Sequence, residues 1–103
     1  MKLLFVYLSP AENVLSDEEW QVIEQSLLDN PTVGVVIPGT GGVRKLRVAF
    51  ANRGKRGSAR TVYLYVDRDK IVYFLLAYAK NTQEDLTADQ KRQIRAVAEK
   101  LKH

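Results

Sequence analysis

The 103-residue sequence contains no cysteine, and its only histidine is the last residue, His103. The absence of cysteine excludes disulfide bonds, thiolate catalysis and cysteine metal sites. A single terminal histidine, whether native or left from a tag, argues against histidine-based metal binding and histidine acid–base catalysis. We therefore expect a protein without a metal or other cofactor, in which any catalysis uses other side chains.

Long apolar runs are also missing. The opening stretch 3–8 is apolar but much shorter than the ~20 residues of a membrane span. The following Ser9-Pro10 offers only a weak signal-peptide cleavage site. Hydrophobic content of 46% and charged content of 27% are typical of a globular protein. We expect one cytoplasmic domain over residues 1–103, with no membrane partner.

Acidic residues are absent from positions 44–60, whereas the first 43 residues contain six acidic residues and one basic residue. The net charge of +4 therefore conceals a concentrated basic segment. An ordinary solvated surface is the alternative, but the exclusion of acids favours a surface that binds a polyanion, with RNA as the leading candidate. The seven basic residues are Arg44, Lys45, Arg47, Arg53, Lys55, Arg56 and Arg60.

The first part of this basic segment alternates between charged and apolar residues. Strand side chains point to opposite faces in turn, so Lys45 and Arg47 are expected together on one face. Leu46, Val48 and Phe50 would then face the core. Residues 53–57 form a loop between two expected strands, where cations could contact phosphate or simply remain solvated.

Two capping boxes predict two helices. Ser16 with Glu19 opens the first, and Thr87 with Gln90 opens the second. The first helix stops before Pro31, because the residue preceding proline is pushed out of the helical region. The expected core-facing stripes are Trp20, Ile23 and Leu27, with Leu28 beside them, and Ile94, Val97, Ala98 and Leu101.

Strands are expected at residues 3–8, 45–51, 59–66 and 71–79, with an ordered loop or short extended segment at 31–43. Residues 71–79 are apolar on both faces, as in a strand that is covered on both sides. The short connection at 67–70 predicts an antiparallel pair. The order β-α-β-β-β-α indicates an α+β domain, a twisted antiparallel sheet with the helices packed on one face.

Four tyrosines lie on the last two strands. Aromatic side chains beside cations can stack RNA bases, but tyrosines in a β-rich core are ordinary packing. We assign Tyr63, Tyr65 and Tyr73 to the core. Tyr78, at a strand end, is the tyrosine that we expect near a site.

An ordered set of motifs resembles the HigB subgroup of the RelE/ParE toxin superfamily over roughly residues 14–102. The matching segments are Asn30-Pro31, residues 37–47, residues 54–60, residues 76–81 and Asp85-Leu86-Thr87. The resemblance implies a small RelE-like endoribonuclease that enters the ribosomal A site and cleaves mRNA. It also implies a cognate antitoxin, usually a helix-turn-helix protein.

The resemblance also assigns residues by position. Lys45 and Arg47 match two cations on a strand of RelE-type enzymes, and Arg60 matches the arginine that opens the next strand. Lys80 or Asn81 falls where the family has a further basic residue. The family's catalytic tyrosine would fall near Thr87, where this sequence has none, which leaves the general base open with Tyr78 as a substitute.

Together these observations give an expected site. RNA cleavage by its own 2′-hydroxyl requires positioning, proton transfer and stabilisation of a dianionic phosphorane. Arginine suits phosphate binding, and like-charge repulsion lowers a lysine pKa towards neutrality. We assign Arg47 and Arg60 to the phosphate and Lys45 to proton transfer. Tyr78 and Lys80 complete the catalytic set, and the expected RNA-binding residues are Arg44, Arg53, Lys55, Arg56 and Asn81.

Two other functions remain open from the sequence. A ParE-like toxin of the same fold would act on DNA gyrase, and a non-catalytic RNA-binding module would use the same surface for affinity alone. The distribution of charge does not separate these possibilities.

Overall fold

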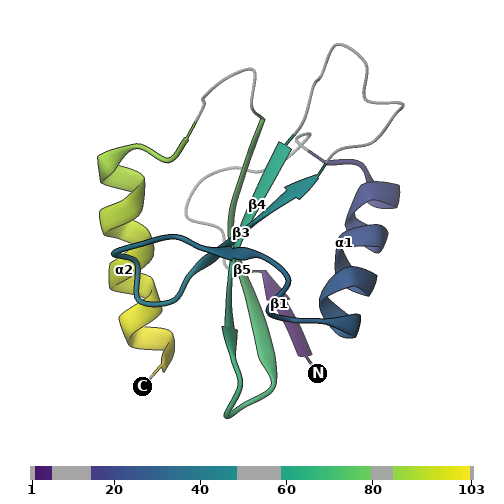
Figure 1. Ribbon diagram of the computed structural model, residues 1–103, viewed down its shortest axis with the longest axis horizontal. Coiled ribbons are helices and arrows are strands. Elements are labelled where there is room, and N and C mark those ends of the chain that lie inside the picture. The colour runs from purple at the N-terminus through teal and green to yellow at the C-terminus, as the bar shows by residue number, and fades with distance from the viewer. Residues whose placement is uncertain (1, 6–14, 49–58, 80–84, 103) are drawn as a thin grey trace.

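The computed structural model describes residues 2–5, 15–48, 59–79 and 85–102. Two helices and a five-stranded sheet with the strand order β1-β5-β4-β3-β2 form one α+β domain (Figure 1), which confirms the predicted fold class. The elements are β1 (Lys2–Phe5), α1 (Asp17–Asp29), β2 (Val35–Val36), β3 (Arg44–Val48), β4 (Ala59–Val66), β5 (Ile71–Ala79) and α2 (Ala88–Lys102).

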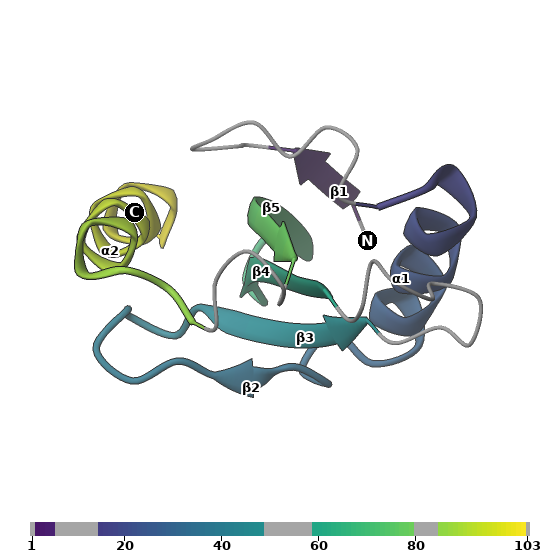
Figure 2. The ribbon, with the colours of Figure 1, turned by 90° about the horizontal axis from the view of Figure 1, so that it is seen from above.

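The sheet differs from the expectation at its two edges (Figure 2). β1 pairs with β5 in parallel, whereas the other pairs among the described strands are antiparallel. The expected extended segment within 31–43 forms β2, which pairs with β3 through Val35 and Val36. Short-range patterns specify strands but not the distant strand with which an edge strand pairs, so the parallel pairing was not foreseen.

The two helices lie on opposite faces of the sheet, so the prediction that both pack on one face is wrong (Figures 1 and 2). Ile23 and Leu27 of α1 pack in a cluster with Tyr63, whereas Ile94 of α2 packs in a separate cluster with Val62. The physical reason is the alternation of β4, in which apolar side chains point to both faces. β5 is likewise apolar on both faces and needs cover from both sides.

Both capping boxes form as predicted. The Glu19 backbone N–H donates to Ser16 Oγ at 3.2 Å, and the Ser16 N–H donates to Glu19 Oε1 at 2.8 Å. Gln90 and Thr87 exchange the equivalent bonds at 3.1 and 2.9 Å. These bonds satisfy amide groups that have no partner within the first turn.

The apolar stripe of α1 is narrower than predicted. Ile23 and Leu27 are buried, and the Trp20 ring packs edge-on against Phe74 with the ring centroids 5.2 Å apart. Leu28 is 50% exposed, so its assignment to the stripe is wrong. Its position beside Leu27 on the helix turns it towards solvent. The predicted apolar stripe of α2 is confirmed.

The described part of the chain contains two helices, α1 and α2. Neither of them is long and apolar enough to cross a membrane.

Tyr63 fixes the segment that precedes β2 to the sheet. Its fully buried hydroxyl donates to the Pro31 carbonyl and accepts from the Gly34 N–H, both at 2.9 Å. Arg44 Nη1 donates to the carbonyls of Thr32 and Gly34 at 3.1 and 2.7 Å. A Cβ at Gly34 would lie 2.8 Å from the Tyr63 ring, so glycine permits this close approach.

We expect Tyr63→Phe to lower the free energy of unfolding by about 1–3 kcal/mol, because it leaves a buried N–H and carbonyl without their partner. Urea denaturation measures the change. Tyr65→Phe is the matched control, because its hydroxyl bonds to the exposed Asp67 carboxylate. Equal stability of the Tyr63→Phe variant and the wild type would contradict the anchoring role.

Candidate functional site

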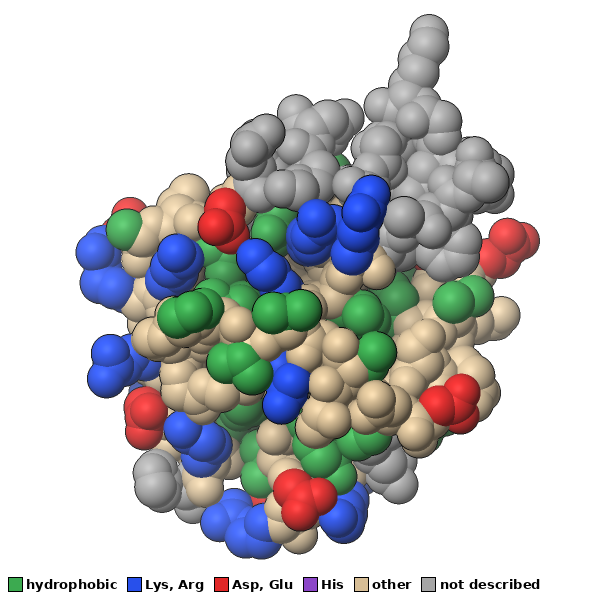
Figure 3. Space-filling view, viewed as in Figure 1, with side chains coloured by type: hydrophobic (Ala, Val, Ile, Leu, Met, Phe, Trp, Pro, Cys, Tyr) green, Lys and Arg blue, Asp and Glu red, His purple; other side chains and the backbone are tan. Residues whose placement is uncertain are grey.

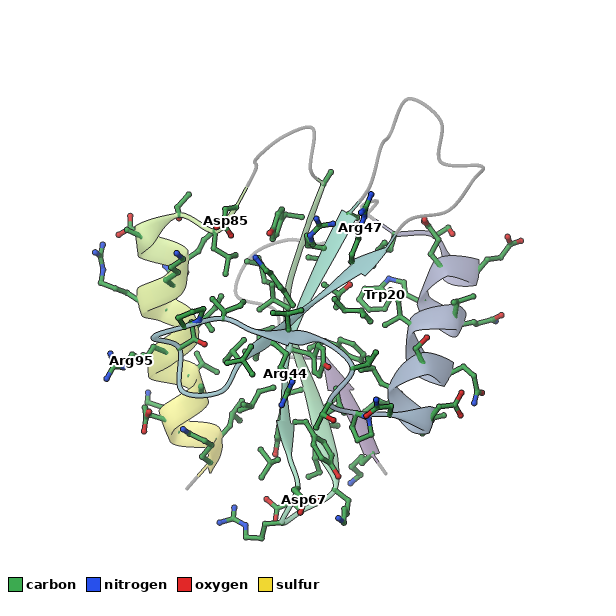
Figure 4. All side chains as sticks on the ribbon, viewed as in Figure 1. Trp20, Arg44, Arg47, Asp67, Asp85 and Arg95 are labelled. Atoms are coloured by element: carbon green, nitrogen blue, oxygen red, sulfur yellow. The ribbon has the colours of Figure 1, made fainter. Side chains whose placement is uncertain are left out.

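Three of the expected site residues form one row across the sheet. Arg47 of β3 pairs with Arg60 of β4, and Arg60 pairs with Tyr78 of β5. Directly opposed residues of neighbouring strands share a face, with Cβ atoms about 4.5–5.5 Å apart. The row lies where β3 and β5 end and β4 begins, at the end of the sheet opposite the turn that contains Asp67 (Figure 4).

Lys45 lies on the same face, two residues before Arg47, opposite Val62. The predicted common face of Lys45, Arg47 and Arg60 is therefore present, but it is also the face on which α2 packs. Arg47 is exposed, whereas Lys45 and Arg60 are half-buried. Lysine and arginine side chains gather at this end of the molecule in the space-filling view (Figure 3).

Arg44 does not share this face. It is opposite Tyr63 in β4, on the alternate parity from Lys45 and Arg47. Its guanidinium donates to backbone carbonyls of the segment before β2, and it lies near mid-sheet in Figure 4. The structure thus gives Arg44 a role in holding this segment to the sheet, apart from the row of Arg47, Arg60 and Tyr78.

Five expected site residues lie outside the residues that the structure describes. They are Arg53, Lys55 and Arg56 of the basic loop, and Lys80 and Asn81 after β5. Phe50, which was expected in the core, also lies outside the described residues. Leu46 packs against the cluster on the α1 face, as expected.

Tyr78 is 5% exposed and belongs to the core cluster beneath α2. Burial raises the pKa of its phenol, the Asp85 charge raises it further, and the Arg60 charge opposes the shift. The phenol is therefore protonated at neutral pH. Asp85 and Arg60 therefore each lie within electrostatic reach of Tyr78.

Asp85 was not among the residues predicted for the site. It lies just before α2, and its Oδ1 accepts a 2.8 Å hydrogen bond from the Leu86 N–H. Leu86 packs in the same cluster as Tyr78, and Figure 4 shows Asp85 at the same end of the molecule as Arg47. The sequence offered only its place in the Asp85-Leu86-Thr87 motif, because its position near Tyr78 depends on tertiary packing.

Because of Tyr63 and Tyr78, we expect the free energy of unfolding to depend on pH in the alkaline range. Burial raises the pKa of both Tyr63 and Tyr78, against the opposing effects of the Gly34 N–H and Arg44 at Tyr63 and of Arg60 at Tyr78. Above the unfolded value of about 10, the unfolded chain binds fewer protons than the folded protein, so stability falls as pH rises. Thermal unfolding from about pH 8 to 11 measures this loss of stability. In the Tyr78→Phe variant, stability should decrease less steeply with pH. An unchanged slope in that variant would contradict the shift.

Among the described residues, no group of three His, Cys, Asp or Glu side chains could hold a metal ion. The row supplies two guanidinium groups and a phenol, and Lys45 and Asp85 add an ammonium group and a carboxylate at the same face and end. Guanidinium groups bind phosphate oxygens in a bidentate manner.

Comparison with known proteins gives a family and several similar solved chains, of which a RelE structure is an example. The structure, a double arginine-to-alanine mutant of the E. coli toxin RelE in the free state, has a TM-score of 0.49 and 14% sequence identity, covering 82% of this chain and 90% of that chain. The family model described as the RelE toxin of the RelE / RelB toxin–antitoxin system matches residues 36–103. This match includes β3, β4 and β5, which carry the whole row, and Asp85, which lies just before α2. The chain therefore belongs to the RelE toxin family, the toxins of toxin–antitoxin systems.

Proposed function

We propose that this chain is a toxin of the HigB type, a metal-independent endoribonuclease that cleaves mRNA in the ribosomal A site and arrests translation. The observation that supports this proposal most is the pairing of Arg47 with Arg60 on one face of the sheet, with Lys45 on the same face. Two adjacent guanidinium groups can bind the oxygens of one phosphate.

Each residue of the face has a chemical role in this reaction. The 2′-hydroxyl of one nucleotide attacks the adjacent phosphorus, which develops additional negative charge on the phosphate oxygens. Arg47 and Arg60 stabilise this charge, because fixed cations aimed at a developing oxyanion lower the barrier. Lys45, as an ammonium group, donates a proton to the departing 5′-oxygen. Lys55, Arg56 and Lys80 bind the RNA backbone in this proposal, with Arg53 and Asn81 beside them.

The neutralising partner belongs to the proposal as well. A cell that makes this toxin needs an antitoxin, for which we propose a helix-turn-helix protein encoded beside it. Covering the face of Arg47 and Arg60 is one direct way to block RNA. Failure of any adjacent gene product to bind the toxin or to restore growth would count against this part of the proposal.

The test is cleavage of a defined mRNA on ribosomes with an empty A site, with the new 5′ ends mapped by primer extension. The proposed function predicts cuts in the A site with ribosomes and little cleavage without them. A ParE-like toxin would instead damage DNA and leave mRNA intact. A passive RNA-binding protein would bind RNA without cleaving it or arresting growth.

A further inference from the structure

The proposed cleavage needs a group that accepts the proton of the attacking 2′-hydroxyl, and the assigned cations do not provide one. Arginine is protonated at all physiological pH values, and an ammonium group must first lose its own proton before it can act as a base. Tyr78 is protonated at neutral pH, because a tyrosine pKa is ordinarily about 10 and burial beneath α2 raises it further. Within the described part of the chain, we therefore look for the base among the other side chains at this end of the sheet.

Asp85 is a carboxylate at this end of the same face. Tyr78 pairs directly with Arg60 in the sheet, and Tyr78 packs in one cluster with Leu86, the neighbour of Asp85. The bond from the Leu86 N–H holds one carboxylate oxygen at 2.8 Å. The residue itself is exposed, so a substrate can reach it.

We propose that Asp85 is the general base of this site, an inference that rests on the proposed function. In the reaction, the 2′-hydroxyl proton passes to the Asp85 carboxylate as the bond between the 2′-oxygen and phosphorus forms. The bond from phosphorus to the 5′-oxygen breaks, and that oxygen takes a proton from the Lys45 ammonium group. The products are a 2′,3′-cyclic phosphate and a 5′-hydroxyl. Water then returns the proton from Asp85 to Lys45, so no co-reactant is consumed.

The charges around Asp85 are compatible with this role. Arg47 on β3 and Arg60 on β4 supply positive charge at this end of the face, and the neutral Tyr78 comes from β5. The first turn of α2 adds Asp89, which is paired with Arg92. The base and the phosphate-binding arginines therefore come from separate elements at the same end of the sheet.

The test is the pH dependence of single-turnover mRNA cleavage on ribosomes by Asp85→Asn. Asparagine keeps an oxygen that can accept from the Leu86 N–H, so folding should be preserved and is checked by thermal unfolding. We expect cleavage at neutral pH to fall by about 100-fold. In the variant, the rate should continue to rise with pH as hydroxide replaces the missing base, whereas the wild-type rate levels off. Asp85→Glu should recover part of the activity with the wild-type profile.

Asp67→Asn is the matched control, because this carboxylate is exposed at the opposite end of the sheet (Figure 4). An Asp85→Asn variant with the wild-type rate would overturn the inference. A reduced rate with an unchanged pH profile would also overturn it, because it would identify Asp85 as a positioning residue. Absence of cleavage by the wild-type protein would instead refute the proposed function and this inference together.

Discussion

Replacement of Arg60 by alanine is expected to lower mRNA cleavage on ribosomes by about 10²- to 10³-fold and to abolish growth arrest. Arg60 is the central member of the row, paired with Arg47 on one side and with Tyr78 on the other. Its one described hydrogen bond is a long contact of 3.4 Å from Nη1 to the Ala59 carbonyl. We expect this guanidinium to bind phosphate, and its loss should change stability by only about 0.5 kcal/mol.

Single-turnover cleavage and thermal unfolding, measured on the same preparations, test this prediction. Arg95→Ala is the matched control, because Arg95 is an exposed arginine on α2 that points away from the sheet (Figure 4). Full cleavage by a folded Arg60→Ala variant would remove Arg60 from the mechanism. Loss of folding together with activity would identify Arg60 as a structural residue.

The second large effect is expected for Phe74→Ala, which should lower the free energy of unfolding by about 3–5 kcal/mol. Phe74 is fully buried on the α1 face of β5, and its ring meets Trp20 edge-on. Truncation leaves a cavity between the sheet and α1, which cannot collapse without moving the helix. A domain of this size has a total stability of about 5–15 kcal/mol, so the variant should be close to unfolding at about 37 °C.

Chemical denaturation followed by tryptophan fluorescence measures this loss, because Trp20 is the only tryptophan and lies against Phe74. Leu28→Ala on the same helix is the control, because that side chain is half exposed and should cost much less. A Phe74→Ala variant as stable as Leu28→Ala would show that α1 contributes little to the core.

Much of the fold was predictable because its signals are local. The capping boxes at Ser16 and Thr87 start the helices at the expected places, and β4 and β5 have the predicted bounds. The placement of the helices depends on long-range packing, yet the sequence held evidence for it. Residues 71–79 are apolar on both faces, and such a strand requires a cover on each side.

The candidate site was predictable to the extent that strand parity determines it. Alternation placed Lys45 and Arg47 on one face, and the register adds Arg60 to that face. Arg44 was expected to bind RNA, but the register turns it to the other face, where it holds the segment before β2. Asp85 could not be predicted, because its position relative to Arg60 depends on tertiary packing around Tyr78 and Leu86 rather than on any spacing in the sequence.

The row of Arg47, Arg60 and Tyr78 is assembled from three strands, and this has a consequence during synthesis. A growing chain that has made β3 and β4 already carries both arginines, but β5 is not yet present to pair with β4. The face beneath α2 remains uncovered until that helix, the last described element along the chain, has been made. The nascent chain therefore lacks the complete row within a paired sheet until β5 has been made. If the row binds mRNA as proposed, the ribosome that makes this protein meets the complete row only after β5 and α2 have been made.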